Sequence, residues 1–254
     1  MLKANPRQEK VLELVQRRGY VGVEALAQRF GVTPQTVRRD INQLSEMGLI
    51  ERHHGGAGVT SSVQNVAYST RQILCLEEKR RIAIMLAQHI PDHASLFINI
   101  GTTTEEAAKA LLDRNGLRII TNNLNVASIM CSNPGFEVIV AGGVVRSRDK
   151  GIIGEPTIDL ISQFKVDVGI IGISGIDSDG VLLDFDYREV RVAQAIIENS
   201  RRVFLVADHT KFGRNAMVRL GQIDQVSALF TDRAPPKPIR SLLEKNGVEI
   251  FVAP

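Results

Sequence analysis

A short segment near the N-terminus carries side chains suited to reading the edges of DNA bases. In residues 33–44, three apolar residues, Val37, Ile41 and Leu44, are spaced i, i+4 and i+7, so they form one narrow stripe on a predicted helix. The opposite face presents the amide and guanidinium groups of Gln35, Arg38, Arg39 and Asn42, and the hydroxyls of Thr33 and Thr36 are also expected to contact DNA. Such groups hydrogen-bond to base edges in the major groove. The pattern predicts a recognition helix, and an ordinary surface helix with solvated arginines is the alternative.

The elements expected around this helix form a helix-turn-helix. Val23–Phe30 is predicted as the preceding helix, and Gly31 makes the turn that leads to Thr33. Thr33 is a suitable N-cap, and Pro34 fits the first helical position, where a missing N–H costs nothing. An earlier helix that ends before Gly19 completes the core of this module.

A short strand and a basic tip follow the recognition helix. Alternating residue types in 49–52 predict the strand, and two histidines and two glycines at 53–56 follow it. We interpret this stretch as the wing of a winged helix. The residues expected to lie against phosphates or in the minor groove are Arg52, His53 and His54. A solvent-exposed turn is an equally open interpretation of the two histidines, and no metal is expected there because no other His or Cys lies at ligand spacing.

Length and composition favour two domains. A chain of 254 residues approaches the size at which a single core stops growing, and 44% hydrophobic with 23% charged residues is typical of a soluble globular protein. We expect a DNA-binding domain over residues 1–57, a polar linker over 58–76 and a second domain over 77–254. The whole formal net charge of +3 lies within residues 1–56, which is a pattern typical of nucleic-acid binding.

Nothing in the sequence indicates a secreted or membrane-bound protein. No apolar run reaches about 18 residues, and the N-terminus lacks the apolar core of a signal peptide. Cys75 and Cys131 are the only cysteines, so we expect no disulfide framework and a cytoplasmic location. We expect neither a cofactor nor a membrane partner.

Strands of the second domain are apolar throughout. LFINI, RIITN, VGIIGI and VFLVA do not alternate, which is typical of strands buried on both faces of a sheet. We therefore predict that an α+β winged helix-turn-helix is followed by an α/β domain with a mainly parallel sheet between helices. The expected strands are 95–100, 117–121, 136–141, 166–173, 202–207, 226–230 and 248–252, and the expected helices are 78–89, 105–113, 126–131, 188–199 and 239–246.

Polar loops follow several of these strands. Because ligands bind beyond the carboxyl ends of parallel strands, the loops at 101–104, 121–123, 142–150, 177–180 and 208–211 predict a shared site. Small residues and three hydroxyls at 101–104 precede a helix whose free N–H groups attract an anion. With a cation such as Arg146 beside the phosphate, and Asn and Asp groups on the hydroxyls, the loops suit a small phosphorylated polyol.

Each loop also has a purely structural interpretation. Thr104 can cap its helix, residues 186–189 resemble a capping box, and residues 177–180 suit a turn. The basic residues at 146, 148 and 150 can lie in solvent. The GTTT sequence lacks the lysine of a P-loop, so it does not identify a nucleotide.

The motifs in both halves resemble the DeoR-type family of bacterial repressors. The resemblance lies in VEALAQRFGVTPQTVRRDINQL and RHHGGA of the N-terminal part, and in INIGTT, TNNLNVA, AGG, GISGIDSDG, FDYREVR and KFGRNAMV of the C-terminal part. It implies a winged helix-turn-helix joined to a sensor domain with a fold similar to ribose-5-phosphate isomerase. It also implies double-stranded operator DNA as a partner, glycerol 3-phosphate as the inducer and a homo-oligomer, either a dimer or a tetramer.

The resemblance also implies a set of ligand-binding residues. The phosphate loop corresponds to Gly101, Thr102, Thr103 and Thr104, and the other residues that the resemblance implies are Thr121, Asn122, Gly142, Gly143, Asp177, Glu189, Arg191 and Lys211. Arg146 joins this set from the basic cluster after the third strand. The family usually has an aspartate two residues before the glycine of this loop, whereas this chain has Asn99. An amide can still hydrogen-bond to a ligand hydroxyl, but it brings no negative charge.

An enzyme is the competing class of function. In a sugar-phosphate isomerase or related transferase, Asp177, Glu189 and Lys211 would serve as base, acid and anion clamp, and their mutual geometry decides whether they can. A repressor that responds to a different sugar phosphate is a further alternative, because the sequence does not discriminate between polyols.

Overall fold

The computed structural model describes residues 5–46, 49–53, 55–58, 65 and 67–254. Its internal contacts divide the chain into a first unit, Met1–Ile73, and a second unit, Leu74–Pro254. The segment expected to be a linker, 58–76, contains the short helix α4, Tyr68–Ile73. Residues 59–64 and 66 of that segment lie outside the described residues, as do Gly48 and His54.

The first unit is a winged helix-turn-helix. Its elements are α1 (Pro6–Arg18), β1 (Tyr20–Gly22), α2 (Val23–Phe30), α3 (Pro34–Glu46), β2 (Glu51–His53) and β3 (Gly56–Gly58), and the strands form an antiparallel sheet in the order β1-β3-β2. Strand β1 was not expected, because three residues carry too little alternation to be recognised. It pairs with β3, and the amide of Val23 at the start of α2 donates to the carbonyl of Gly55 at 2.7 Å.

The helix predicted over residues 33–44 is confirmed as α3. The side chains of Val37, Ile41 and Leu44 are at most 1% exposed, and they pack in one cluster with residues of α1 and α2. The Thr33 hydroxyl accepts a hydrogen bond from the amide of Thr36 at 3.3 Å, as expected of an N-cap. Gly31, in the left-handed region at φ 62°, ends α2.

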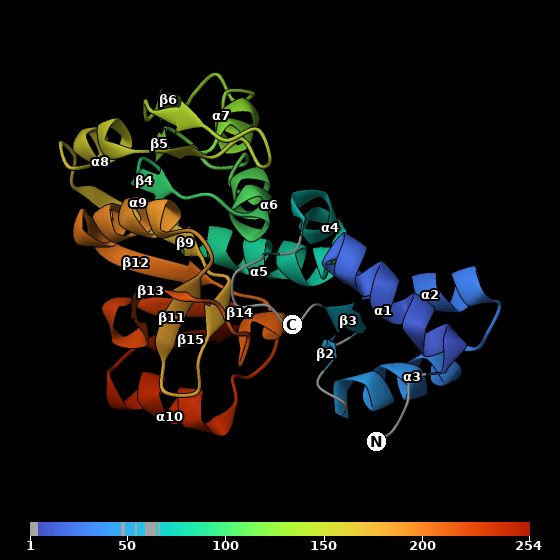
Figure 1. The fold of residues 1–254 in the computed structure, drawn as a ribbon. Helices are drawn as coiled ribbons and strands as arrows, with labels where there is room; N and C mark the ends of the chain where they lie inside the picture. Colours follow the sequence, from blue (N-terminus) through green and yellow to red (C-terminus); the bar gives the residue numbers. More distant parts are fainter. Residues whose placement is uncertain (1–4, 47–48, 54, 59–64, 66) are drawn as a thin grey trace. The chain divides into compact units, whose positions relative to one another are not determined.

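A seven-stranded parallel sheet forms the centre of the second unit, as predicted (Figure 1). Its order is β15-β14-β12-β9-β4-β5-β6, with β4 at Ser95–Ile98, β5 at Arg118–Thr121, β6 at Glu137–Val140, β9 at Val166–Gly172, β12 at Ser200–Val206, β14 at Ala228–Thr231 and β15 at Glu249–Val252. All of these strands correspond to predicted ones.

Helices cover both faces of this sheet. One apolar cluster joins it to α5 (Leu76–Gln88), α6 (Thr102–Ala110) and α7 (Leu124–Met130), and the other joins it to α8 (Glu155–Ile161), α9 (Tyr187–Glu198) and α10 (Lys237–Lys245). Side chains within a strand alternate between the clusters, since Leu96 and Ile98 belong to the first and Phe97 to the second. Burial on both faces explains why these strands are apolar throughout.

Several short elements escaped prediction. They are helix α8, the hairpin of β7 (Val144–Val145) and β8 (Ile152–Ile153), the small sheet of β10 (Gly175–Ile176), β11 (Val181–Asp184) and β13 (Val218–Gln222), and the 3-10 turns η1 (His209–Lys211) and η2 (Ile223–Gln225). Helix α6 was also expected to begin at Glu105, but it begins at Thr102. The three threonines therefore form its first turn instead of a loop before it.

Adjacent glycines after β6 provide a matched test of the turn that leads into the β7–β8 hairpin. Gly143 has φ 144°, and a Cβ there would overlap with Thr157 Oγ1 and lie 2.7 Å from the carbonyl oxygen of Ile153. A Cβ on Gly142 would meet nothing within 4 Å. We expect Gly143→Ala to lower the free energy of unfolding of the second unit by about 1–3 kcal/mol, because of backbone strain and overlap.

The matched variant Gly142→Ala is expected to change this free energy by less than about 0.5 kcal/mol. Urea unfolding followed by circular dichroism measures both variants, since the chain has no tryptophan to report by fluorescence. Equal stability of the two variants would show that the turn at Gly143 is not constrained as described.

Candidate functional site

The outward face of α3 carries the groups predicted to read DNA. Thr33, Gln35, Arg38 and Arg39 are exposed, and Thr36 is partly exposed. The guanidinium and amide groups therefore lie on the solvent side of the helix, opposite its buried stripe. In this position they are free to approach base edges in a major groove.

Two hollows in the first unit flank α3. One, of about 200 Å³, lies between α3 and the wing and is lined in part by Arg38, Arg52 and His53. The other, of about 370 Å³, is lined in part by Arg7 and Arg39 and by residues from the start of α3. Arg38 and Arg52 thus place positive charge between α3 and the wing, where phosphates of a bound duplex would lie. In the second hollow Arg39 does the same, whereas Arg7 is paired with Asp40.

Not every predicted DNA-binding residue faces solvent. Arg52 is exposed, but the His53 side chain is only 13% exposed and its ring centre lies 5.9 Å from that of Tyr20. Asn42 is partly buried, and its Oδ1 has no hydrogen-bond partner among the described residues. His54 lies outside the described residues. Arg52 is therefore the better placed of the two described wing residues for contact with a phosphate.

In the second unit, the order of the strands places a ligand site at one point of the sheet. The chain runs outward from β4 to β5 and β6, and then returns to β9 on the other side of β4. This reversal is a topological switch point, where ligands of open parallel sheets bind beyond the carboxyl ends of the strands. The loop after β4, with Asn99 and Gly101, lies at this switch point, and Gly172 at the end of β9 approaches Thr104.

The three threonines after β4 have different roles. The hydroxyl of Thr104, which is fully buried, donates to the carbonyls of Asn99 and Gly101, each at 2.7 Å. The hydroxyls of Thr102 and Thr103 have no hydrogen-bond partner within the described chain. No side chain caps α6, whose N-cap is Gly101 at φ 154°. Thr104 therefore holds the turn, and Thr102 and Thr103 remain available together with the first N–H groups of the helix.

Asn99 and the loop after β5 add further polar groups. Asn99 Oδ1 accepts from the amide of Ile100 at 2.7 Å, which leaves its Nδ2 as a donor. Thr121 donates to the carbonyl of Ile98 at 2.7 Å, so its role is structural. Asn122 is 1% exposed and donates through Nδ2 to the carbonyl of Ile152, whereas its Oδ1 has no partner in the part of the chain that the structure describes. Asn122 thus offers a buried acceptor at this edge.

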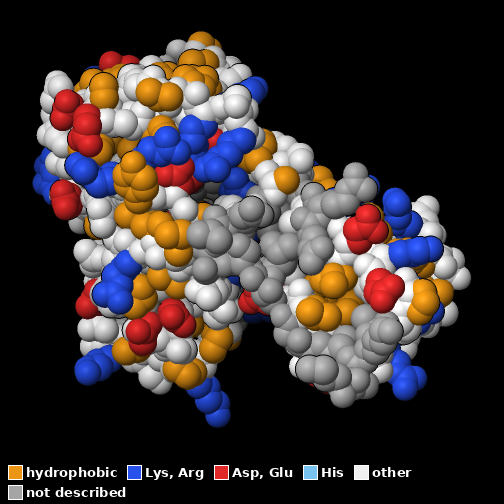
Figure 2. All heavy atoms as spheres, in the orientation of Figure 1, with side chains coloured by type: hydrophobic (Ala, Val, Ile, Leu, Met, Phe, Trp, Pro, Cys, Tyr) orange, Lys and Arg blue, Asp and Glu red, His pale blue; other side chains and the backbone are white. Residues whose placement is uncertain are grey.

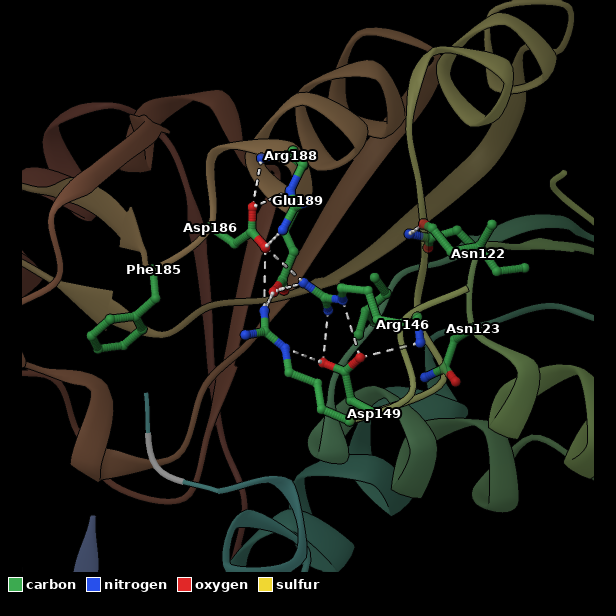
Figure 3. Close-up of polar contacts among 12 residues, drawn as sticks. Asn122, Asn123, Arg146, Asp149, Phe185, Asp186, Arg188 and Glu189 are labelled. Carbon is green, nitrogen blue, oxygen red and sulfur yellow. Dashed lines mark hydrogen bonds and ion pairs between the residues drawn. The ribbon is translucent and has the colours of Figure 1, made fainter. Parts of the chain in front are cut away.

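Arg146 is the centre of a charged cluster that Figure 3 shows. It is 8% exposed, and it donates to both carboxylate oxygens of Asp149, at 3.2 and 2.7 Å, and to Asp186 and Glu189. Arg148 also donates to Asp186 and Glu189, at 3.3 and 3.1 Å. Together with Arg188, which pairs with Asp186, these six residues are called the Arg146 cluster. The cluster ties the β7–β8 hairpin to the start of α9.

The charges of the Arg146 cluster cancel. Burial raises the pKa of Asp186, but hydrogen bonds from Arg188 and the charges of Arg188 and Arg146 outweigh it, so this pKa lies below its usual value. Burial lowers the pKa of Arg146, but Glu189, Asp149 and Asp186 raise it by more. Three cations therefore face three carboxylates at neutral pH. The stabilisation from Asp186 is present above the ordinary aspartate pKa of 3.8 and is lost as the pH falls through the lower folded value.

Basic and acidic side chains also lie side by side elsewhere on the second unit, as the face drawn in Figure 2 shows. At the end of β12, Lys211 Nζ lies 3.7 Å from Asp208 Oδ2. Burial raises the pKa of Asp208. The charges of Lys211 and Lys79 and the hydrogen bonds from the hydroxyl and amide of Thr210 lower it by more, so this pKa lies below its usual value. Lys211, which was predicted to bind the ligand, therefore already neutralises the buried carboxylate of Asp208.

Cys75, Asp208 and His209 place one potential metal-ligating atom each within 4.8 Å of one another. Burial, together with the charges of Asp208 and Glu78, raises the pKa of the Cys75 thiol to about 12, although Lys211 and Lys79 oppose this. Metals bind the thiolate, which is scarce at neutral pH for such a thiol. The neighbouring ammonium groups also repel a cation. This donor set does not favour a metal site.

The structure does not bring all predicted ligand residues together. Asp177 is exposed at the turn between β10 and β11. Gly180 of this turn lies against Ile223 and against Leu242 of α10. Arg191 is exposed and lies 3.4 Å from Glu155. Glu189 belongs to the Arg146 cluster, Lys211 pairs with Asp208 and Asp177 lies at an exposed turn, so the three groups that an enzyme would need do not interact with one another.

Sequence reasoning missed several residues of this edge. Asp149 and Asp186 bind Arg146, and Arg214, which is 9% exposed, donates to the carbonyl of Ser174 at 3.2 Å and stacks over the ring of Phe185 at 5.0 Å. The helix start expected from residues 186–189 is present, since the Asp186 side chain accepts from the amide of Arg188, but the sequence did not indicate that Asp186 also binds Arg146. Nothing in the local sequence around Arg214 indicates its burial.

Comparisons with known proteins agree with both units. Residues 7–63 match the DeoR-like helix-turn-helix domain, and residues 75–233 match the DeoR C-terminal sensor domain. The chain is 53% identical, over 98% of its own length and 99% of the relative's, to the glycerol-3-phosphate regulon repressor of Escherichia coli strain K12. It is also 47% identical, over 99% of its length and 96% of the relative's, to the HTH-type transcriptional repressor CsqR of the same strain.

Solved structures that resemble this chain include a ribose 5-phosphate isomerase. Ribose 5-phosphate isomerase A from Methanocaldococcus jannaschii is 10% identical at a TM-score of 0.41, covering 54% of this chain and 55% of that one. A TM-score this low carries no argument about function. No helix among the described residues is long and apolar enough to span a membrane.

The exposed arginines of α3, the wing and the match of both units to one family lead to the same conclusion. Full-length relatives at about half identity are repressors. The chain therefore belongs to the DeoR family, and it is a DNA-binding transcriptional repressor, a regulator rather than an enzyme.

Proposed function

We propose that this repressor controls genes of glycerol 3-phosphate metabolism and that glycerol 3-phosphate releases it from operator DNA. The observation that carries the ligand proposal is the start of α6, where Thr102 and Thr103 have hydroxyls without partners at the switch point of the sheet. The name of the relative at 53% identity supports the choice of metabolite. No cofactor is needed, because binding and release involve no covalent step.

The chemistry of the site suits a phosphate ester that also carries hydroxyls. Free N–H groups and two hydroxyls at the start of α6 would donate to the phosphate, and the helix dipole favours negative charge there. Asn99 Nδ2 offers a further donor, where a carboxylate would repel the phosphate. Asn122 Oδ1 is the acceptor that a polyol hydroxyl requires.

Release from DNA requires two arrangements of the protein that differ in their affinity for the operator. A ligand that binds the weaker-binding arrangement better by roughly 1–3 kcal/mol changes operator affinity about 5- to 150-fold. We propose that the repressor acts as a homo-oligomer, dimer or tetramer, because a pair of recognition helices reads two half-sites of an operator.

A different sugar phosphate is the second candidate for the inducer. The relative named CsqR, at 47% identity over nearly the full length, supports it, because family membership at this level does not select one metabolite. Titration of the operator complex with phosphorylated compounds of three to six carbons, at fixed salt, separates the two candidates. Salt must be constant because protein–DNA affinity falls steeply with it.

Neighbouring threonines test the ligand site. We expect Thr103→Val to keep normal operator affinity and normal stability, but to need roughly tenfold more glycerol 3-phosphate for release, because one hydrogen bond to a charged group is lost. Thr104→Val should instead lower the free energy of unfolding by about 1–3 kcal/mol, because its hydroxyl bonds to two carbonyls inside the protein. Fluorescence anisotropy of labelled operator measures release, and a normal response of Thr103→Val would remove this residue from the site.

The arginines of α3 test the DNA-reading face. Arg38→Ala and Arg39→Ala are each expected to weaken specific operator binding by about 5- to 150-fold while inducer affinity stays unchanged. Arg240→Ala is the matched control, since Arg240 forms only an exposed pair with Glu244 in α10. If both α3 variants bound operator as tightly as the control does, this face would not be the one that reads DNA.

A further inference from the structure

The recognition helix has a carboxylate on its buried side. Asp40 is 3% exposed and shares this side with Val37, Ile41 and Leu44. Burying a carboxylate is costly unless it is paired and hydrogen-bonded. Because the three apolar neighbours could hold the helix without it, the position of Asp40 calls for a role other than packing.

Arg7 of α1 supplies the partner. Its Nε donates to Asp40 Oδ2 at 2.6 Å and its Nη2 donates to Oδ1 at 3.1 Å, which is the bidentate geometry of an arginine–carboxylate pair. Gln8 adds a contact to Asp40 Oδ1 at 3.3 Å and one to Gln43 Oε1 at 2.5 Å. Gln8 is itself held in a capping box with Asn5 at the start of α1. The first turn of α1 is thus fastened to the middle of α3.

The bidentate Arg7–Asp40 pair, called the fork here, restrains a rotation of α3 that apolar contacts alone do not prevent. Hydrophobic packing is not directional, so a helix can roll about its axis while its stripe stays buried. Side-chain atoms lie roughly 6 Å from the helix axis, so a roll of about 20° moves them by roughly 2 Å. That displacement breaks a hydrogen bond to a base edge. Two parallel hydrogen bonds to one carboxylate oppose the roll directly.

We propose that Arg7 is a positioning residue for operator recognition: its fork to Asp40 sets the rotation of α3 at which Gln35, Arg38 and Arg39 face the groove. Asp40 directly follows Arg38 and Arg39 in the helix, so its anchoring fixes the residues that read DNA. The pair acts through the orientation of α3 and contributes specificity beyond the binding that phosphate contacts provide.

Two single variants give the first test. Arg7→Gln and Asp40→Asn should each lose roughly tenfold in specific operator affinity, the size of one base contact, and the double variant should be no worse than the weaker single one. Asp40→Asn is decisive in sign, because removing a negative charge near DNA strengthens binding if only electrostatics matters. Tighter operator binding by Asp40→Asn would overturn the proposal.

The salt dependence distinguishes positioning from a direct phosphate contact. Arg7 also lines the hollow beside Arg39, so a direct contact between Arg7 and a phosphate is the alternative role to test. If Arg7 positions α3, the slope of log affinity against log salt for Arg7→Gln equals that of the unchanged protein. If Arg7 neutralises a phosphate, the slope falls by about 0.9, and this outcome would contradict the proposal. Arg240→Gln, which breaks an exposed pair in α10, is the matched control.

A hydrophobic replacement separates positioning from stability. The Asp40 side chain is 4% exposed and that of Arg7 is 36% exposed, so the pair is buried on its carboxylate side. Replacing buried ionic groups with packed apolar ones often keeps or raises stability. In the double variant Arg7→Met with Asp40→Leu, we expect an unchanged thermal midpoint, unchanged affinity for non-specific DNA and a roughly tenfold loss of operator affinity. Full operator affinity in this variant would show that the pair merely stabilises the fold. If the double variant had a lower thermal midpoint, the direction of the change in operator affinity caused by Asp40→Asn would still test the proposal.

Discussion

The hydroxyl of Thr104 is the interaction on which the proposed ligand site depends. Its hydrogen is shared between the carbonyls of Asn99 and Gly101 and closes the turn between β4 and α6, while no side chain caps the N–H groups of the helix. The first N–H groups of α6 and the hydroxyls of Thr102 and Thr103 therefore stay available at the one place where the strand order reverses. A capped helix in the same place would offer an anion much less.

The surrounding charges restrict how an anion can bind. The cations of the Arg146 cluster already have carboxylate partners, and Lys211 has Asp208. A phosphate would thus gain little from these cations unless it displaced a carboxylate, so in the proposed site the uncharged donors of α6 would make its first contacts. Displacement of a carboxylate from Arg146 would loosen the β7–β8 hairpin from α9. The same principle of a fixed charge pair recurs in the first unit, where Arg7 and Asp40 orient α3.

Much of the fold and part of the site could be predicted from the sequence. The stripe of Val37, Ile41 and Leu44 and the apolar strands are local patterns, and they identified the recognition helix and the parallel sheet. The different roles of Thr103 and Thr104 could not be predicted, because they depend on which hydroxyl reaches a carbonyl across the turn. Arg7 lies 33 positions from Asp40, and Asp186 and Glu189 lie 40 and 43 positions from Arg146, so no local pattern indicates these contacts. Only Asp149, three positions from Arg146, is a local partner.

The coupling between ligand and operator is the central claim, and reciprocal affinities test it most directly. The affinity for glycerol 3-phosphate should be measured by calorimetry with the free repressor and with the repressor saturated by operator, at one salt concentration. We expect operator to weaken ligand binding about 5- to 150-fold, by the same factor by which the ligand weakens operator binding. Equal ligand affinity in the two states, or no binding in either, would contradict this account.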